Sequence, residues 1–243
     1  MRHRSIRANR TAIRPGAVAG AKDLSTLAKT TLAILILCLG VIALPSTSSA
    51  AARVSDPANS SAKHVSGSAG LFADWVIASS DNHGLPFIIV DKKNAEVVVF
   101  YPDGRLRGAS PALLGLARGD DSVPGIGQRK LSSITPEERT TPAGRFVASL
   151  GNDLGKKNVV WVDYDAAISL HRVITTNPKE HRLHRLATAS ILDNRISYGC
   201  INVPVKFYDT VVEPSFTGTN GIVYILPDVR SIKAVFPASD VNG

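Results

Sequence analysis

The chain has 243 residues and a formal net charge of +8, and most of that charge lies near its N-terminus. Residues 1–50 contain seven Lys or Arg and one Asp, a net charge of +6, which leaves +2 for the remainder. A remainder so close to neutral lacks the basic surface that nucleic acid requires, so we exclude a nucleic-acid partner.

The first fifty residues have the composition of a secretory signal peptide. A basic segment precedes an apolar stretch from about Leu32 to Leu44, and the small residues Ser48–Ala50 follow. We expect cleavage after Ala50 or Ala51 and export to the periplasm or cell envelope, with membrane contact only through this segment. An uncleaved anchor is the alternative, although a span needs about 20 apolar residues. Cleavage removes Cys38 and leaves Cys200 as the single thiol.

The remainder is expected to form one domain with flexible ends. Residues 51–84 are rich in small residues and indicate a linker, in which residues 71–78 could form one or two helical turns. Residues 85–228 have the size of a single domain with a sizeable core. Residues 229–243 are expected to be a C-terminal tail. Nothing in the sequence indicates an oligomer, and we expect a monomer.

The expected domain is mainly β. Short runs rich in β-branched residues, separated by Gly, Pro and Asn, predict strands. The expected strands are Pro86–Val90, Ala95–Tyr101, Val147–Leu150, Val159–Val162, Ala166–Val173 and Gly221–Leu226. A hairpin is expected through residues 91–94, and short helices are expected at residues 136–139 and 207–212. Many short strands with few helices favour a sandwich or a barrel.

The most informative segment contains the single remaining thiol. Cys200 lies between Gly199 and Ile201, and His171 follows an apolar alternating run upstream. A lone Cys with a His elsewhere in an exported protein is a candidate nucleophile and base, because an imidazole can take the thiol proton. The alternative to a catalytic role is an inert Cys buried in the core.

The motifs around these residues occur in a recognisable order. The string Ser-x-Gly-Cys-Ile-Asn at 197–202 resembles the active-site signature of the L,D-transpeptidase (YkuD-like) catalytic domain. Thr140–Phe146 is similar to that family's Thr-Pro-x-Gly-x-Phe element, and Ile88–Phe100 is similar to its first hairpin. The resemblance covers roughly Leu85 to Pro227. It implies a β-sandwich with short helices and with the Cys and His on adjacent elements at one end.

The resemblance also implies roles for individual residues. Cys200 corresponds to the nucleophile, with Gly199 letting the backbone approach the substrate. The base is expected to be His171, at the end of a strand. His181 and His184 are the rivals, because the family normally has a shorter gap between its His and Cys and His181 fits that gap better. The basic stretch around His181 reads as a solvated insertion, or alternatively as a lid.

Further motif positions have supporting roles, and two positions depart from the family. Ser197 and Asn202 are expected to fix the loop by local hydrogen bonds, and Arg195 to pair with a substrate carboxylate. Tyr198 stands where the family usually has His, which puts the acyl acceptor in doubt. Arg172 stands where the family commonly has Gly after its His.

The expected function is therefore an exported cysteine acyltransferase that crosslinks peptidoglycan stem peptides. One alternative is an L,D-carboxypeptidase or crosslink hydrolase that uses water as the acceptor, and another is an inactive wall-binding module of the same fold. No cofactor is expected. No metal site is expected either, because His181 and His184 have no carboxylate or Cys partner nearby in a ligand pattern.

Overall fold

The computed structural model describes residues 65–155 and 157–241. The expected signal peptide and most of the expected linker therefore lie outside the described residues. None of the helices in the described part is long and apolar enough to span a membrane.

The chain's described part opens with a helix that is longer than expected. Helix α2 covers Gly67–Ser79, and the Ser66 hydroxyl caps it by accepting a hydrogen bond from the Ala69 N–H at 3.3 Å. The buried side chains of Phe72 and Val76 pack on the sheet, so this segment belongs to the domain instead of a linker.

The expected hairpin forms. Strands β1 (Phe87–Asp91) and β2 (Glu96–Phe100) pair antiparallel, and β3 (Leu106–Pro111) pairs with β2. The Asp91 carboxylate closes the turn by accepting from the N–H groups of Lys93 (3.0 Å) and Asn94 (3.1 Å).

Within the described residues, eight strands form one mixed sheet, in the order β3-β2-β1-β10-β5-β6-β7-β9. Its remaining members are β10 (Gly221–Ile225), β5 (Gly144–Asn152), β6 (Asn158–Asp163), β7 (Ile168–Arg172) and β9 (Ile201–Val203). The pairs β1/β10 and β7/β9 are parallel and the others are antiparallel. A second, two-stranded parallel sheet joins β4 (Leu114–Gly115) to β8 (Arg195–Ser197).

Two apolar clusters lie on opposite faces of the first strands. Ile88 and Val90 of β1 share a cluster with Leu170 of β7 and Ile201 of β9, at the far end of the sheet order. Strands from both halves of this single sheet thus contribute to one core, so the sheet curves around it. Alternate residues of β1, such as Phe87, pack in the second cluster with α2 and the C-terminal segment. The mainly-β prediction is confirmed.

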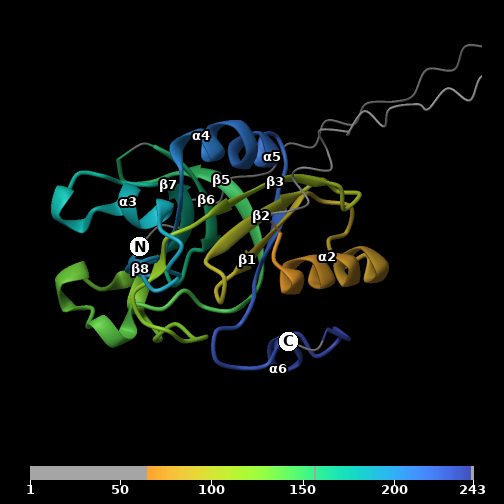
Figure 1. Cartoon of the computed structure of the whole chain (residues 1–243), viewed down its shortest axis with the longest axis horizontal. Helices are drawn as coiled ribbons and strands as arrows, with labels where there is room; N and C mark the ends of the chain where they lie inside the picture. The colour runs from red at the N-terminus through yellow and green to blue at the C-terminus, as the bar shows by residue number, and fades with distance from the viewer. Residues whose placement is uncertain (1–64, 156, 242–243) are drawn as a thin grey trace, which may run out of the picture. The chain divides into compact units, whose positions relative to one another are not determined.

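Helices are short apart from α2 (Figure 1). A continuous helical segment consists of α4 (Val205–Phe207), the π-helix η6 (Tyr208–Val212) and α5 (Glu213–Phe216). Single turns form η2 (Ile126–Gln128), η3 (Leu131–Ser133), η4 (Pro136–Glu138) and η5 (Pro178–Glu180), and α3 spans Arg182–Ala187. Helix α6 (Ile232–Val235) lies in the expected tail, which packs on the sheet because Ile232, Phe236 and Val241 are buried.

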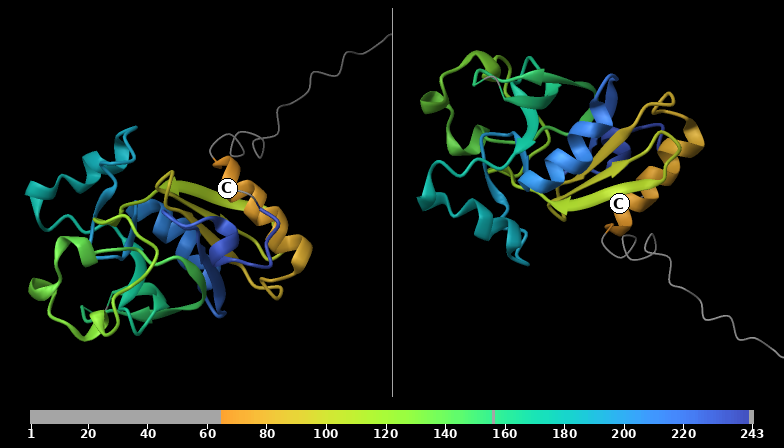
Figure 2. Two further views of the ribbon diagram at one scale, coloured as in Figure 1. Left: turned by 90° about the horizontal axis from the view of Figure 1, so that it is seen from below. Right: turned by 90° about the horizontal axis from the view of Figure 1, so that it is seen from above.

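Two long excursions flank the last strands of the sheet. Figure 2 shows residues 116–143, in green, and residues 173–194, in teal, at the end of the domain away from α2. Residues 173–194 connect β7 to β8, so this end of the domain carries the residues singled out from the sequence.

Candidate active site

Parallel pairing of β7 with β9 brings the predicted nucleophile and base together. Leu170 pairs with Ile201, and His171 pairs with Asn202. Cys200 immediately precedes β9, so it lies beside the β7 segment that carries His171. Successive side chains of a strand alternate between its faces, which places Ser169 on the same side of β7 as His171.

The Cys200 thiol has three polar neighbours. Its Sγ is 3.6 Å from the Ser169 hydroxyl and 3.6 Å from the carbonyl oxygen of Ala167. The imidazole of His171 is near enough to the same thiol for each group to shift the pKa of the other. Cys200 is partly exposed, as a nucleophile must be to reach a substrate.

The two groups shift each other's protonation. Burial favours the neutral thiol, but the hydrogen bond and charge of His171 outweigh it and lower the pKa of Cys200. Burial likewise disfavours the imidazolium, yet the interaction with Cys200 raises the pKa of His171. Both directions favour a thiolate–imidazolium ion pair, which is the reactive form of a catalytic Cys.

A backbone hydrogen bond fixes the orientation of the base. The Nδ1 of His171 lies 2.7 Å from the carbonyl oxygen of Arg172. A carbonyl can only accept, so Nδ1 carries a proton, and Nε2 is the ring nitrogen that can take the proton of the thiol when the ion pair forms.

The loop that carries the nucleophile is held from within. The Ser197 hydroxyl donates to the Cys200 carbonyl at 2.6 Å and accepts from the Gly199 N–H at 3.0 Å. The Asn202 amide donates to the same Cys200 carbonyl at 3.2 Å. Both side chains therefore make the local hydrogen bonds predicted for them.

Only glycine fits at position 199. Its φ is +128°, and a Cβ there would lie 2.7 Å from both the Thr140 carbonyl oxygen and the Ile168 Cδ1. The backbone therefore approaches its neighbours more closely than any side chain permits.

Tyr198 stacks with a cation. The guanidinium carbon of Arg139 lies 4.0 Å from the centroid of the Tyr198 ring, a cation–π arrangement. The aromatic ring thus has a defined partner from the 116–143 segment where the family usually has a second imidazole.

Arg195 is placed differently from the expectation. Its guanidinium pairs with Asp228 at 2.8 Å and donates to the Lys92 carbonyl at 2.8 Å, and its side chain is 10% exposed. Its charge is already matched inside the protein, so it is not free to bind a substrate carboxylate. No local pattern predicts this pairing, because Asp228 lies 33 residues away.

Arg172 explains how the chain accommodates a large residue after His171. Its side chain pairs with Asp209 (2.6 Å) and Glu213 (2.7 Å). Its guanidinium also lies 4.2 Å from the ring centroid of Tyr208. The residue therefore points toward the α4–α5 segment and ties β7 to it.

The 173–194 segment, which contains His181 and His184, contacts the site through Arg182 instead of through either histidine. His181 and His184 are exposed, and the structure gives neither of them a contact with Cys200. Arg182 donates from Nη1 to the Asn202 Oδ1 at 2.8 Å. Its positive charge partly opposes the rise in the pKa of His171 that Cys200 causes. The sequence interpretation missed Arg182 and also Ser169, because neither has a motif signal.

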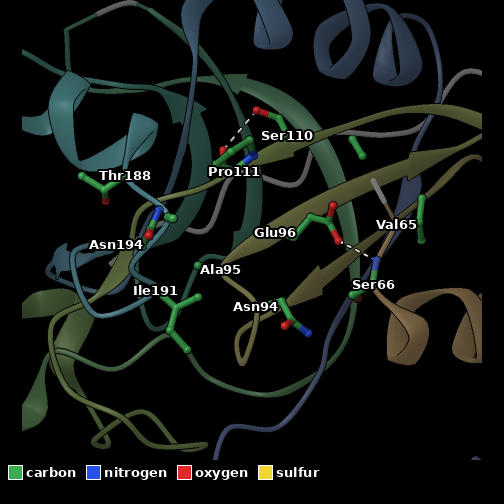
Figure 3. Close-up of a pocket in the computed structure, with 12 residues that line it drawn as sticks. Val65, Ser66, Asn94, Ala95, Glu96, Ser110, Pro111, Thr188, Ile191 and Asn194 are labelled. Atoms are coloured by element: carbon green, nitrogen blue, oxygen red, sulfur yellow. Dashed lines mark hydrogen bonds between the residues drawn. The ribbon is translucent and has the colours of Figure 1, made fainter. Parts of the chain in front are cut away.

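The structure also contains a cavity that neither Cys200 nor His171 lines. A cavity of about 690 Å³ lies between the start of α2, the β2–β3 hairpin and residues 188–194 (Figure 3). Its lining includes Ser66, Ser110 and Asn194 but neither Cys200 nor His171. Among the described residues, no three His, Cys, Asp or Glu side chains gather in a way that could hold a metal ion.

Comparison with known proteins gives matches only among solved structures. No protein-family model and no curated protein matches the chain. It is similar to Pgp2, the helical cell shape determining protein of Campylobacter jejuni, at 15% identity and a TM-score of 0.41. That alignment covers 66% of this chain and 57% of Pgp2, so the chain spans little more than half of that protein.

Two L,D-transpeptidases are also similar. The catalytic domain from Enterococcus faecium matches at 17% identity and a TM-score of 0.32, covering 58% of this chain and 95% of that domain. The enzyme from Xylanimonas cellulosilytica matches at 13% identity and a TM-score of 0.35, covering 58% and 60%. These chains belong to the family that the sequence motifs resemble. The likeness is one of fold, at low sequence identity.

Proposed function

We propose that the protein is an exported cysteine acyltransferase that acts on peptidoglycan stem peptides. The observation that carries the proposal is the parallel pairing of β7 with β9, which brings Cys200, immediately before β9, beside His171 of β7. The two groups lower the pKa of the thiol and raise that of the imidazole. Such a pair is the geometry of nucleophilic catalysis by a thiol.

The first half-reaction forms a thioester. Nε2 of His171 holds the thiol proton while the Cys200 thiolate adds to the carbonyl after the third residue of a tetrapeptide stem. The C–S bond forms and the carbonyl electron pair moves to oxygen. When the tetrahedral intermediate collapses, the C–N bond breaks and the imidazolium gives its proton to the leaving amine of the terminal D-residue.

The second half-reaction releases the acyl group to an acceptor. An amine from a second stem attacks the thioester, His171 takes the amine proton, and the thiolate leaves. The product is a crosslink between two stems. Water in place of the amine gives a tripeptide, which is the carboxypeptidase alternative.

The substrate class is supported by the motifs. The Thr140–Phe146 element and the Ser197–Asn202 string resemble the L,D-transpeptidase signature, and the structure places Thr141 of the first in contact with Gly199 of the second. Elements 58 residues apart in the sequence thus form one site.

Digestion of purified muropeptides tests the proposal. The exported protein is incubated with tetrapeptide muropeptides, with Cys200→Ala as the matched inactive variant. We expect crosslinked dimers and free D-residue from the wild type only, and a thioester adduct on intact mass at Cys200. Tripeptides without dimers would instead indicate hydrolysis. The absence of both products and of any adduct would indicate a wall-binding module and refute the proposal.

Export is proposed on the composition of residues 1–50. N-terminal sequencing of protein from the cell envelope should give a start at about Ala51. A retained Met1 would show that the segment stays on the protein as an anchor.

A further inference from the structure

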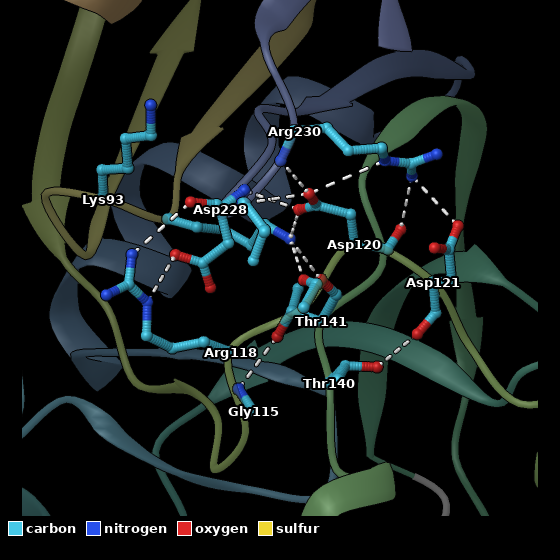
Figure 4. Close-up of polar contacts among 12 residues, drawn as sticks. Lys93, Gly115, Arg118, Asp120, Asp121, Thr140, Thr141, Asp228 and Arg230 are labelled. Carbon is cyan, nitrogen blue, oxygen red and sulfur yellow. Dashed lines mark hydrogen bonds and ion pairs between the residues drawn. The ribbon is translucent and has the colours of Figure 1, made fainter. Parts of the chain in front are cut away.

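Lys92 has an unusual environment for a residue in a hairpin turn. Its side chain is fully buried, and its ammonium group donates to Asp120 Oδ1 (2.8 Å), the Gly119 carbonyl (2.6 Å) and the Thr141 carbonyl (2.7 Å). An ammonium group has three hydrogens, so every one of them is used. The cluster is shown in Figure 4.

The partner carboxylate is held equally firmly. Asp120 accepts hydrogen bonds from the backbone N–H groups of Asp228 (2.5 Å), Val229 (3.0 Å) and Arg230 (2.7 Å). The buried ion pair therefore joins the hairpin turn, the 116–143 segment and the chain after β10. It fixes the backbone of Thr141 at the point where that residue faces the nucleophile loop.

The Thr141 hydroxyl bridges two backbone groups. It donates to the Gly199 carbonyl at 2.8 Å. It also accepts from the Gly115 N–H at 2.9 Å (Figure 4). The side chain is fully buried, so water does not compete for either bond.

Holding the Gly199 carbonyl also orients the Cys200 amide. The two groups belong to one planar, trans peptide unit, in which C=O and N–H point in opposite directions. The N–H of Cys200 is therefore directed away from Thr141. Ser197 and Asn202 hold the next carbonyl, that of Cys200 itself, so the peptide units on both sides of the nucleophile are fixed.

We infer that Thr141 is a positioning residue for acyl transfer, whose hydroxyl orients the Cys200 N–H toward the oxygen that becomes negative when the thiolate adds to the carbonyl. The amide of the nucleophilic residue is a common donor to such an oxyanion. Lys92 supports this function by fixing Thr141. The inference rests on the proposed function, since only an acyl-transfer step creates the oxyanion.

Two reactions of Cys200, alkylation and acylation, distinguish orientation of the oxyanion donor by Thr141 from a general structural role of this residue. Alkylation by iodoacetamide needs the thiolate but forms no oxyanion, whereas acylation by a carbapenem needs both. The variants are Thr141→Val, which keeps the shape but removes the hydroxyl, and Thr141→Ser, which keeps the hydroxyl. Acylation is followed by intact mass and alkylation by loss of free thiol, with thermal unfolding as the check on folding.

We expect Thr141→Val to slow acylation by about 10- to 10²-fold. Loss of a whole oxyanion donor costs about 10²–10³-fold, and this variant misaligns the donor without removing it. Alkylation should change less than about 2-fold, and Thr141→Ser should restore most of the acylation rate.

Several results would overturn the inference. Equal slowing of alkylation and acylation would show that Thr141 acts on the thiolate or on the whole loop. Slow acylation in Thr141→Ser as well as in Thr141→Val would assign the effect to packing of the methyl group. If Thr141→Val does not fold, Thr141→Ser and Thr141→Ala are compared instead, and equal acylation rates refute the role of the hydroxyl. A wild-type protein that is alkylated but never acylated would refute the proposed function itself.

Discussion

Replacement of His171 by Ala tests which histidine is the base. In the wild type, His171 lowers the pKa of Cys200 against the opposing effect of burial. Without the imidazole, burial remains and the thiol pKa rises above its ordinary value of about 8.5. At pH 7 a pKa of about 8.5 leaves roughly 3% of the thiol as thiolate, and a higher pKa leaves less. Adding the loss of proton transfer, we expect acylation to slow by about 10²–10⁴-fold.

The assay measures carbapenem acylation and iodoacetamide alkylation across pH. Alkylation of the wild type should rise with a midpoint below about 8.5, and that of the His171→Ala variant should rise only above it. Acylation of the wild type should fall at acid pH as the Cys200 thiol becomes protonated, and this loss should begin at a higher pH in His171→Ala, because His171 lowers the pKa of Cys200. His181→Ala and His184→Ala are the matched controls and should retain the wild-type profile. A nearly normal His171→Ala variant, with the profile lost in His181→Ala, would refute the assignment.

Three further substitutions test the surroundings of the site. Arg182→Ala removes a positive charge that acts on His171, so the pKa of that imidazole should rise in an NMR titration, whereas Arg182→Lys should leave it nearly unchanged. Arg172→Ala should lower the free energy of unfolding in urea by about 1–3 kcal/mol, because it removes two partly exposed ion pairs and a cation–π contact. Arg105→Ala, at an exposed ion pair, is the control and should change it little. Lys92→Met removes the buried counter-charge of Asp120 and leaves it only the more distant Arg230, at 3.7 Å. It should lower the free energy of unfolding by up to about 3–5 kcal/mol, and a loss below about 1 kcal/mol would contradict the buried pair.

Strands with a clear apolar period could be predicted from the sequence. The β1–β2 hairpin and strands β5, β6, β7 and β10 all overlap the expected runs. Strand β3 could not, because Leu106–Pro111 lacks the β-branched pattern and pairs only through tertiary contact with β2. Strands β8 and β9 have three residues each, too few to show any period.

The predicted nucleophile and base could be found because they have local signals, a motif around Cys200 and a strand end at His171. Residues that act through distant partners could not be assigned in this way. Arg195 was expected to face the substrate, but its partner Asp228 follows 33 residues later. Lys92 sits in a turn whose composition indicates exposure, and only the fold brings Asp120 beside it.

The parallel pairing of β7 and β9 has a consequence for the spacing of the nucleophile and the base. A parallel pair needs a crossover, and here residues 173–200 provide it between the two strands. Because the ladder fixes both ends, the length of this crossover does not set the distance between His171 and Cys200. Lengthening a loop is inexpensive, since each doubling adds only about 0.6 kcal/mol of closure entropy. The part of the crossover before β8 can therefore change length, while a one-residue slip in the three paired positions would turn His171 to the opposite face of the sheet.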